Sequence, residues 1–78
     1  MFYVYILQLK DGSYYIGYSS NLKQRIKEHN KGLVLSTKNL RPVKLIFYAA
    51  FSNNKKALAF EKYLKSSSGF AFRNKRLI

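Results

Sequence analysis

The stretch that decides the fold is "FYVYILQLKDGSYYIGYS", which runs from Phe2 to Ser19. Residues Phe2 to Leu9 are β-branched, aromatic or leucine apart from Gln8, a composition typical of a strand. A second strand is expected from Ser13 to Ser19. Between the two, "KDG" suits a three-residue hairpin loop whose last residue, Gly12, takes the left-handed conformation that glycine adopts without strain.

The length of this loop decides which side chains share a face of the hairpin. With a three-residue loop, Leu7 pairs with Tyr15 and Tyr5 pairs with Gly17. Tyr3, Tyr5 and Tyr15 then lie on one face, beside a residue that has no side chain. A two-residue Asp-Gly turn would shift the pairing and place Tyr5 and Tyr15 on opposite faces, so both registers stay open at this point.

A helix is expected directly after the hairpin, over "SSNLKQRIKEHNKG". Ser20 or Asn21 suits its N-cap, and Gly32 suits its C-terminal stop. On a helical wheel, the apolar stripe and its flank consist of Leu22, Ile26, His29 and Arg25. Arg25 and His29 are therefore expected to face the sheet.

Three further elements follow the polar connection "LVLSTKNLRP". The run "VKLIFYAAF" predicts a third strand, which is apolar on both faces apart from Lys44 and is therefore expected to be covered. The segment "SNNKKALAFEKYLKS" predicts a second long helix, capped by Ser52, Asn53 or Asn54. The tail "SSGFAFRNKRLI" indicates a Ser/Gly break followed by a short basic element.

The length and the order of elements predict one α/β (α+β) domain over residues 1–78, with a small three-stranded antiparallel sheet flanked by helices. A chain this short buries only about 60% of its unfolded surface, so its core must be compact. The chain has no cysteine, which excludes disulfides and thiolate metal sites and is compatible with the cytoplasm.

The charge of the chain is strongly positive, with 15 Lys and Arg against three Asp and Glu, a net charge of +12. Such an excess favours a polyanionic partner, with nucleic acid first and an anionic membrane surface second. Trp is absent, no apolar run approaches the ~20 residues of a membrane span, and the basic residues are spread over several elements. The start "MFYVYILQL" predicts a strand and not a signal peptide. Nucleic acid is therefore the expected partner.

An acidic residue lies where an apolar one is expected. In the second long helix Ala57, Phe60 and Leu64 form the inward stripe, and Glu61 falls in the middle of it. A carboxylate on an apolar stripe is unfavourable unless it is paired or binds a cation. The simple explanation is a salt bridge to one of the many basic residues. The other is a divalent cation such as Mg²⁺, which a single carboxylate can hold together with a substrate phosphate.

Four other residues have ordinary explanations when each is taken alone. His29 would be a hydrogen-bonded core residue, Arg25 a phosphate or carboxylate contact, and Tyr5 and Tyr15 core aromatics. Taken together with Glu61 they supply a proton relay, a cation for a developing negative charge and a metal-binding carboxylate. These groups suffice for hydrolysis of a phosphodiester.

The chain resembles the GIY-YIG nuclease domain over nearly its whole length. The resemblance is carried by the ordered set Tyr3-Val4-Tyr5, Tyr15-Ile16-Gly17, Arg25, His29 and Glu61. It is greatest for the small stand-alone bacterial members related to the N-terminal domain of the excinuclease incision subunit, which "HNKG", "STKNLRP", "AFEKYLKS" and "KRL" also resemble. Tyr3 stands where the motif has its first glycine.

The resemblance implies a role for each of these residues. Tyr5 and Tyr15 would position or deprotonate the attacking water. Arg25 would stabilise the pentacovalent phosphate, and His29 corresponds to the family's helix histidine. Glu61 would bind one divalent cation, Mg²⁺ or Mn²⁺, and no small-molecule cofactor is implied.

Further contacts with the substrate are expected from four residues: Gly17, Lys38, Arg41 and Asn74. Gly17 closes the motif and is expected to leave space for a phosphate. The predicted function is metal-dependent hydrolysis of phosphodiester bonds in nucleic acid, with DNA as the expected substrate. The alternative is an inactive basic module of the same fold that only binds nucleic acid. Glu61 separates the two, because binding a polyanion gains nothing from a carboxylate in the site.

Overall fold

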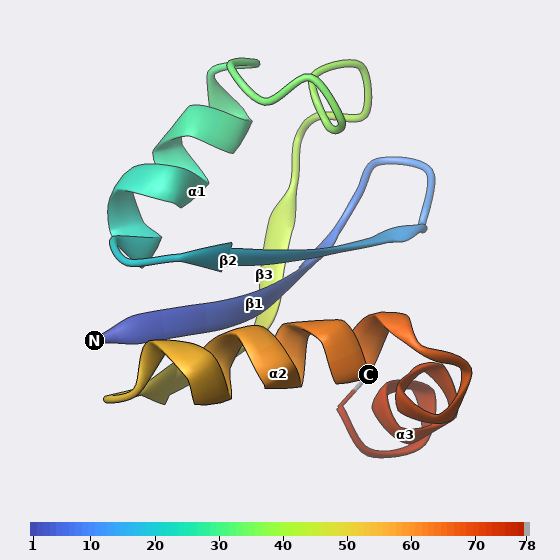
Figure 1. Ribbon diagram of the computed structural model, residues 1–78. Helices are drawn as coiled ribbons and strands as arrows, with labels where there is room; N and C mark the ends of the chain where they lie inside the picture. Colours follow the sequence, from blue (N-terminus) through green and yellow to red (C-terminus); the bar gives the residue numbers. More distant parts are fainter. Residues whose placement is uncertain (78) are drawn as a thin grey trace.

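A three-stranded antiparallel sheet forms the centre of the fold, as the sequence predicts (Figure 1). The computed structural model describes residues 1–77, apart from the side chains of Ser67 and Phe70. The strands are β1 (Phe2–Gln8), β2 (Tyr14–Ser19) and β3 (Lys44–Phe51), in the spatial order β2-β1-β3. The helices are α1 (Leu22–Asn30), α2 (Asn54–Lys65) and α3 (Ser67–Arg76). The predicted α+β class is confirmed.

The hairpin has the three-residue loop and not the two-residue alternative. Gly12 has a φ of +87°, and the backbone N–H of Leu9 donates to the carbonyl of Ser13 at 2.8 Å. Tyr5 consequently lies opposite Gly17. The carboxylate of Asp11 accepts a hydrogen bond from the Ser13 backbone N–H at 3.0 Å, which stabilises the turn.

Each face of the sheet carries a separate apolar cluster. On one face, α2 packs over the cluster of Val4, Ile6, Ile16, Ala57 and Leu64. On the other face, residues of α1 pack over the cluster of Tyr5, Leu7 and Leu9, with Tyr15, Leu22, Leu40 and Val43 around it. In Figure 1, β2 runs between α1 above and α2 below. Side chains from both helices can therefore meet at the β2 edge of the sheet.

The helices begin where side chains can cap them. Asn21, and not Ser20, is the N-cap of α1, since its side chain accepts from the backbone N–H of Gln24 at 3.2 Å. Asn53 caps α2 in the same way. The expected Ser/Gly break is only one residue long: Ser66 ends α2 and caps α3. No helix within residues 1–77 has the length and apolar character needed to span a membrane.

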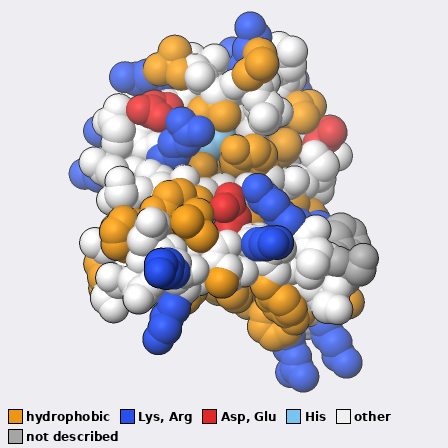
Figure 2. Space-filling view, in the orientation of Figure 1, with side chains coloured by type: hydrophobic (Ala, Val, Ile, Leu, Met, Phe, Trp, Pro, Cys, Tyr) orange, Lys and Arg blue, Asp and Glu red, His pale blue; other side chains and the backbone are white. Residues whose placement is uncertain are grey.

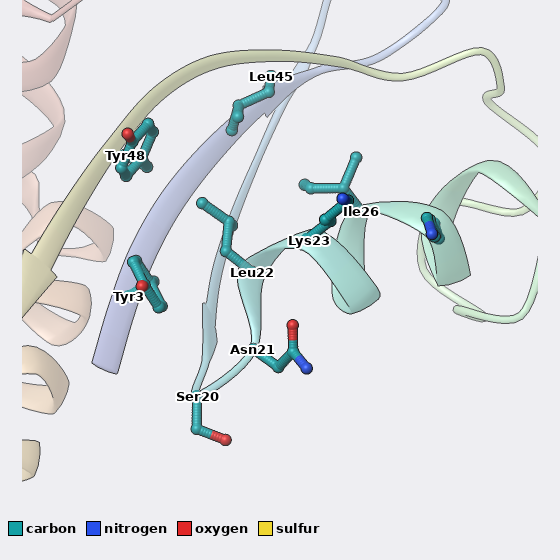
Figure 3. Close-up of a pocket in the computed structure, with 9 residues that line it drawn as sticks. Tyr3, Ser20, Asn21, Leu22, Lys23, Ile26, Leu45 and Tyr48 are labelled. Atoms are coloured by element: carbon teal, nitrogen blue, oxygen red, sulfur yellow. The ribbon is translucent and has the colours of Figure 1, made fainter. Parts of the chain in front are cut away.

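The expectation that β3 is covered on both faces is wrong. β3 lies at an edge of the sheet, and Leu45 and Tyr48 are 37% and 54% exposed. The reason is that α2 covers one face of β3, whereas α1 packs toward β1 and β2 and leaves the other face open. A groove of about 590 Å³ remains between α1 and β3 (Figure 3), with Tyr3, Leu22, Ile26, Leu45 and Tyr48 among its lining residues.

Candidate active site

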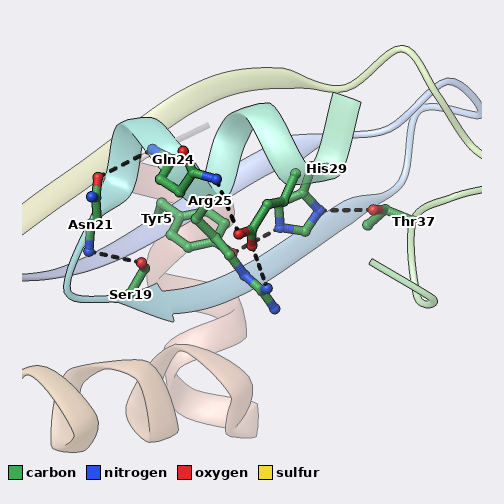
Figure 4. A network of polar contacts seen from close by, with 8 residues as sticks. Tyr5, Ser19, Asn21, Gln24, Arg25, His29 and Thr37 are labelled. Atoms are coloured by element: carbon green, nitrogen blue, oxygen red, sulfur yellow. Dashed lines mark hydrogen bonds and ion pairs between the residues drawn. The ribbon is translucent and has the colours of Figure 1, made fainter. Parts of the chain in front are cut away.

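A chain of hydrogen bonds runs through the space between α1 and the sheet (Figure 4). The hydroxyl of Tyr5 lies 2.9 Å from Nε2 of His29, and Nδ1 of His29 lies 2.8 Å from Oγ1 of Thr37. All three side chains are fully buried. They come from β1, from α1 and from the loop between α1 and β3, so this chain of contacts joins three segments that are distant in sequence.

Arg25 lies beside this chain and favours one placement of its protons. Its guanidinium lowers the pKa of Tyr5, and because a guanidinium can only donate, it acts on the tyrosine oxygen as an acceptor. The hydroxyl of Tyr5 then donates to Nε2 of His29, and the imidazole proton on Nδ1 is donated to Thr37. His29 is therefore assigned as the neutral Nδ1–H tautomer.

Burial sets the protonation states of this chain. It raises the pKa of Tyr5 to about 12, against a smaller lowering by the hydrogen bond from Arg25. Burial also lowers the pKa of His29 below its ordinary value of 6.5, and the positive charge of Arg25 lowers it further. At neutral pH, Tyr5 is thus protonated and His29 uncharged, which is what the hydrogen bonds require.

Gly17 allows Tyr5 to occupy this position. It pairs with Tyr5 across the hairpin, and a Cβ atom at Gly17 would collide with the phenol ring of Tyr5. The expectation that Gly17 leaves space for a phosphate is wrong, because the ring of Tyr5 fills that space. Gly17 is also buried, so its role in the structure is to admit the tyrosine.

Tyr15 lies beside both buried rings. Its ring centroid is 5.1 Å from that of His29 and 6.3 Å from that of Tyr5. Tyr15 is only half-buried, whereas Tyr5 and His29 have no exposed surface. The structure thus brings both predicted tyrosines and the histidine into one cluster, and Tyr15 is its solvent-facing tyrosine.

Arg25 is also held by an acidic neighbour on its own helix. Its Nη1 lies 3.0 Å from Oε1 of Glu28, and the two side chains are 37% and 31% exposed. The hydrogen bond from Arg25 holds the pKa of Glu28 below its ordinary range. A guanidinium has five N–H donors, so these contacts leave donors for a ligand in solvent.

Glu61 approaches the cluster from α2, on the other side of β2. Its side chain is 20% exposed, and its charge raises the pKa of Tyr5, as the smallest of the five causes. Its carboxylate pairs with Nζ of Lys65 at 3.2 Å, one turn further along α2. An exposed pair at this spacing contributes only about 0.3–0.5 kcal/mol, so a stronger ligand can displace the lysine.

The donor set fits one kind of metal site and not another. No group of three or more His, Cys, Asp or Glu side chains converges within residues 1–77, so a closed cage of protein ligands does not form there. Mg²⁺ instead keeps several waters and uses one or two carboxylates together with substrate phosphates. The single half-buried carboxylate of Glu61 fits a cation held in that way.

Three predicted substrate contacts lie outside this cluster. The guanidinium of Arg41 holds the loop after α1, donating from Nε to the carbonyl of Lys38 at 2.8 Å and packing where a Cβ of Gly32 would lie. Lys38 and Asn74 are exposed. Within residues 1–77, none of the hydrogen bonds or ion pairs of these three side chains reaches Tyr5 or His29.

Two residues in this region were not found from the sequence. Thr37 lies in a loop without periodicity, so nothing marks its hydroxyl as the partner of His29. Arg73, next to the predicted Asn74, is only 8% exposed and lies over the ring of Tyr14 at 5.6 Å. Its position on the inner side of α3 could have been found from the helical period had the start of α3 been known.

Comparison with known proteins identifies a family and several relatives of similar sequence. Residues 1–76 match the GIY-YIG catalytic domain. UPF0213 protein CPE1444 of Clostridium perfringens is 46% identical over 66 residues, which are 83% of this chain and 71% of that protein. UPF0213 protein YazA of Bacillus subtilis is 42% identical over 64 residues, 81% of this chain and 65% of that protein. The chain thus spans roughly two thirds of the length of these curated relatives.

A solved structure resembles the fold as well. The solution NMR structure of the UPF0213 protein BH0048 from Bacillus halodurans superposes with a TM-score of 0.61 at 33% identity, covering 99% of this chain and 87% of that one. The resemblance seen in the ordered residues of the motif is therefore matched in sequence and in fold. The chain belongs to the GIY-YIG family.

Proposed function

We propose that this protein is a metal-dependent nuclease that hydrolyses phosphodiester bonds of nucleic acid, with DNA as the first candidate substrate. The observation that carries the proposal is the buried chain from Tyr5 through His29 to Thr37, with the guanidinium of Arg25 acting on Tyr5. A core histidine needs a single hydrogen-bond partner, whereas this chain links a neutral imidazole to a phenol and a partly exposed guanidinium. The GIY-YIG family and the net charge of +12 support the same function.

The chain of hydrogen bonds provides a path for a proton. We assign Tyr15 to contact with the attacking water, because it is the tyrosine that reaches solvent. Tyr5 and His29 lie behind it: as the phenol proton of Tyr5 moves to Nε2 of His29, the phenol oxygen takes up the proton that the attacking water gives up through Tyr15. The lowered pKa of His29 leaves its imidazole neutral and able to accept. Thr37 keeps the imidazole in the required tautomer.

The charged groups act on the phosphate. Arg25 keeps N–H donors toward solvent and would neutralise the charge that develops on the phosphate oxygens in the transition state. Glu61 would hold the divalent cation, Mg²⁺ or Mn²⁺, once Lys65 moves away. The bound cation would polarise the phosphate and stabilise the leaving oxygen.

A second function is favoured by one specific observation. The carboxylate of Glu61 pairs with Lys65, which is the salt bridge expected if Glu61 has only a structural role. The protein would then bind nucleic acid through its basic surface without cleaving it. Figure 2 shows a face on which Lys and Arg side chains outnumber Asp and Glu, which suits both functions.

Glu61→Gln separates the two functions, because it keeps the size of the side chain and removes its charge. Asp11→Asn is the matched control, since it removes the same charge from the hairpin turn and keeps an acceptor for Ser13. Three quantities are measured on each protein: cleavage of branched, flapped, single-stranded and duplex DNA with Mg²⁺ or Mn²⁺, DNA affinity without metal, and the melting shift with Mn²⁺.

A nuclease predicts that Glu61→Gln lowers cleavage by about two to three orders of magnitude, the range found for loss of one group that stabilises transition-state charge. Metal-free DNA affinity should be unchanged or higher, and the Mn²⁺ stabilisation should disappear. Asp11→Asn should keep cleavage and Mn²⁺ stabilisation. Cleavage by Glu61→Gln at the wild-type rate would reject Glu61 as the metal ligand, and a wild-type protein that binds DNA but cleaves none of these substrates would leave the binding module.

A further inference from the structure

A second hollow borders the active-site cluster. Its volume is about 290 Å³, and its lining residues are Tyr14, Tyr15, Ile16, Leu64, Lys65 and Arg73. They come from β2, α2 and α3, so the hollow forms only when α3 packs beside the hairpin. Tyr15 belongs both to this lining and to the ring cluster around His29. The hollow therefore opens next to the proposed position of the attacking water.

The charged side chains that line this hollow are both basic. They are Lys65 and Arg73, and within residues 1–77 no Asp or Glu lines it. Arg73 is the more fixed of the two, because its side chain is only 8% exposed and its guanidinium lies 5.6 Å from the centre of the Tyr14 ring. A planar guanidinium held against an aromatic face is already ordered, so it loses little further conformational freedom when it binds an anion. Its N–H fork suits phosphate oxygens.

We propose that Lys65 and Arg73 form a phosphate subsite that binds the backbone phosphate next to the cleaved one. The proposal rests on the proposed function, in that the ligand is a strand of nucleic acid. The shared position of Tyr15 is what joins the subsite to the cleavage site. The sequence predicted Asn74 as the substrate contact in the C-terminal helix. The proposed contact is its neighbour Arg73, whereas Asn74 is exposed.

Lys65 couples this subsite to the acidic side of the active site. Its Nζ is 3.2 Å from the carboxylate of Glu61, and a phosphate in the hollow competes with Glu61 for the same ammonium group. When Lys65 turns to the phosphate, the carboxylate of Glu61 loses its ion pair with the lysine and becomes free to bind Mg²⁺ or Mn²⁺. Nucleic acid and metal should therefore bind with positive cooperativity.

The first test is the salt dependence of metal-free DNA binding. Lys65→Gln should lower affinity several-fold and reduce the slope of log affinity against log salt by about 0.9 for duplex or about 0.7 for single-stranded DNA, the contribution of one phosphate contact. Lys62→Gln is the matched control, because Lys62 is an exposed lysine of the same helix outside the hollow. Equal slopes for the two variants would overturn the subsite.

Arg73 is tested by two substitutions. Arg73→Lys keeps the charge and loses the planar fork, so it should lose part of the affinity, and Arg73→Gln should lose more. Melting curves show whether each variant is folded. If both variants unfold, the Lys65→Gln and Lys62→Gln slopes decide the question alone.

The second test uses Mn²⁺ as the probe of Glu61. In wild type, Mn²⁺ should raise the melting temperature more when a non-cleavable DNA is bound than when the protein is free. In Lys65→Gln, the free protein should already respond to Mn²⁺, so the difference between free and bound protein should shrink. An unchanged difference would overturn the role of Lys65.

A third measurement separates a backbone phosphate from a free anion. Inorganic phosphate is titrated while the ring signals of Tyr14 and Tyr15 are followed by NMR. Binding of inorganic phosphate together with an unchanged DNA slope in Lys65→Gln would make the hollow a site for free anions and overturn the proposal. If Lys65→Gln reduces the slope but the wild-type protein cleaves no DNA, the subsite stands and the nuclease is rejected. Cleavage with unchanged slopes would reject the subsite alone.

Discussion

Replacing Thr37 with valine removes the acceptor of His29 while almost preserving side-chain volume. His29 and Thr37 are fully buried, and their hydrogen bond is 2.8 Å long. A buried N–H group that loses its acceptor destabilises the fold by about 1–3 kcal/mol. For a domain of this size, each kcal/mol lowers Tm by about 4–8 °C. We therefore expect Thr37→Val to melt roughly 5–20 °C below wild type.

Thr37→Ser is the control, because it keeps the hydroxyl group and removes one methyl group. That loss should lower stability by only about 0.8 kcal/mol, the contribution of one buried carbon. Urea unfolding gives both free energies of unfolding. The imidazole ¹⁵N signals report the tautomer directly, and they are easily assigned because the chain contains one histidine.

The assignment of protons along the chain predicts a particular combination of results. Wild type and Thr37→Ser should show the proton on Nδ1, and Thr37→Val should either lose stability or shift its imidazole to the other tautomer. A Thr37→Val protein that is as stable as wild type and keeps the proton on Nδ1 would refute the reasoning. So would a wild-type imidazole that carries its proton on Nε2.

Three other outcomes are expected. Folding lowers the pKa of His29, so the unfolded chain binds more protons than the folded one as pH falls below 6.5. The free energy of unfolding in urea should therefore decline from pH 7.5 to pH 5.5, by at most about 1.4 kcal/mol per pH unit. His29→Gln should flatten this decline. Gly17→Ala should destabilise by roughly 1–3 kcal/mol, because the new methyl group displaces the ring of Tyr5, and most of this loss should vanish in a Tyr5→Leu background; additive losses in that double mutant would contradict the packing. DNA affinity should fall by roughly 10³-fold or more between 50 and 200 mM salt if at least six phosphates are contacted, and a salt-independent affinity would rule out the basic surface as the binding site.

The parts of the fold that follow from local rules were predictable from the sequence. The position of Gly12 determines the loop, and the loop determines the register that places Tyr5 opposite Gly17. The helical period places Arg25 and His29 on the side of α1 that faces the sheet. The alternation of side chains along a strand and the period of a helix relate residues that are close in sequence, so a few residues suffice to predict which side chains share a face.

The parts that depend on packing between distant segments were not predictable. The apolar sequence of β3 suggested a covered strand, but coverage depends on where α1 packs, and nothing in β3 encodes that position. Thr37 reaches His29 from an irregular loop, and Lys65 pairs with Glu61 when several other cations were available. The sequence also brought Gly17 and Tyr5 together without showing that the ring would occupy the space.

The uncovered strand has a consequence for how copies of the chain behave in concentrated solution. Among the described strands β3 pairs only with β1, and it exposes Leu45 and Tyr48 with Lys44 as its only charged residue. Strand edges of this kind tend to add to one another and aggregate. Mutual repulsion between chains of charge +12 opposes that contact, and it is screened beyond about 10 Å at 0.1 M salt. The basic surface therefore also acts as a colloidal stabiliser, and a polyanion that neutralises it in equal charge should bring the protein out of solution.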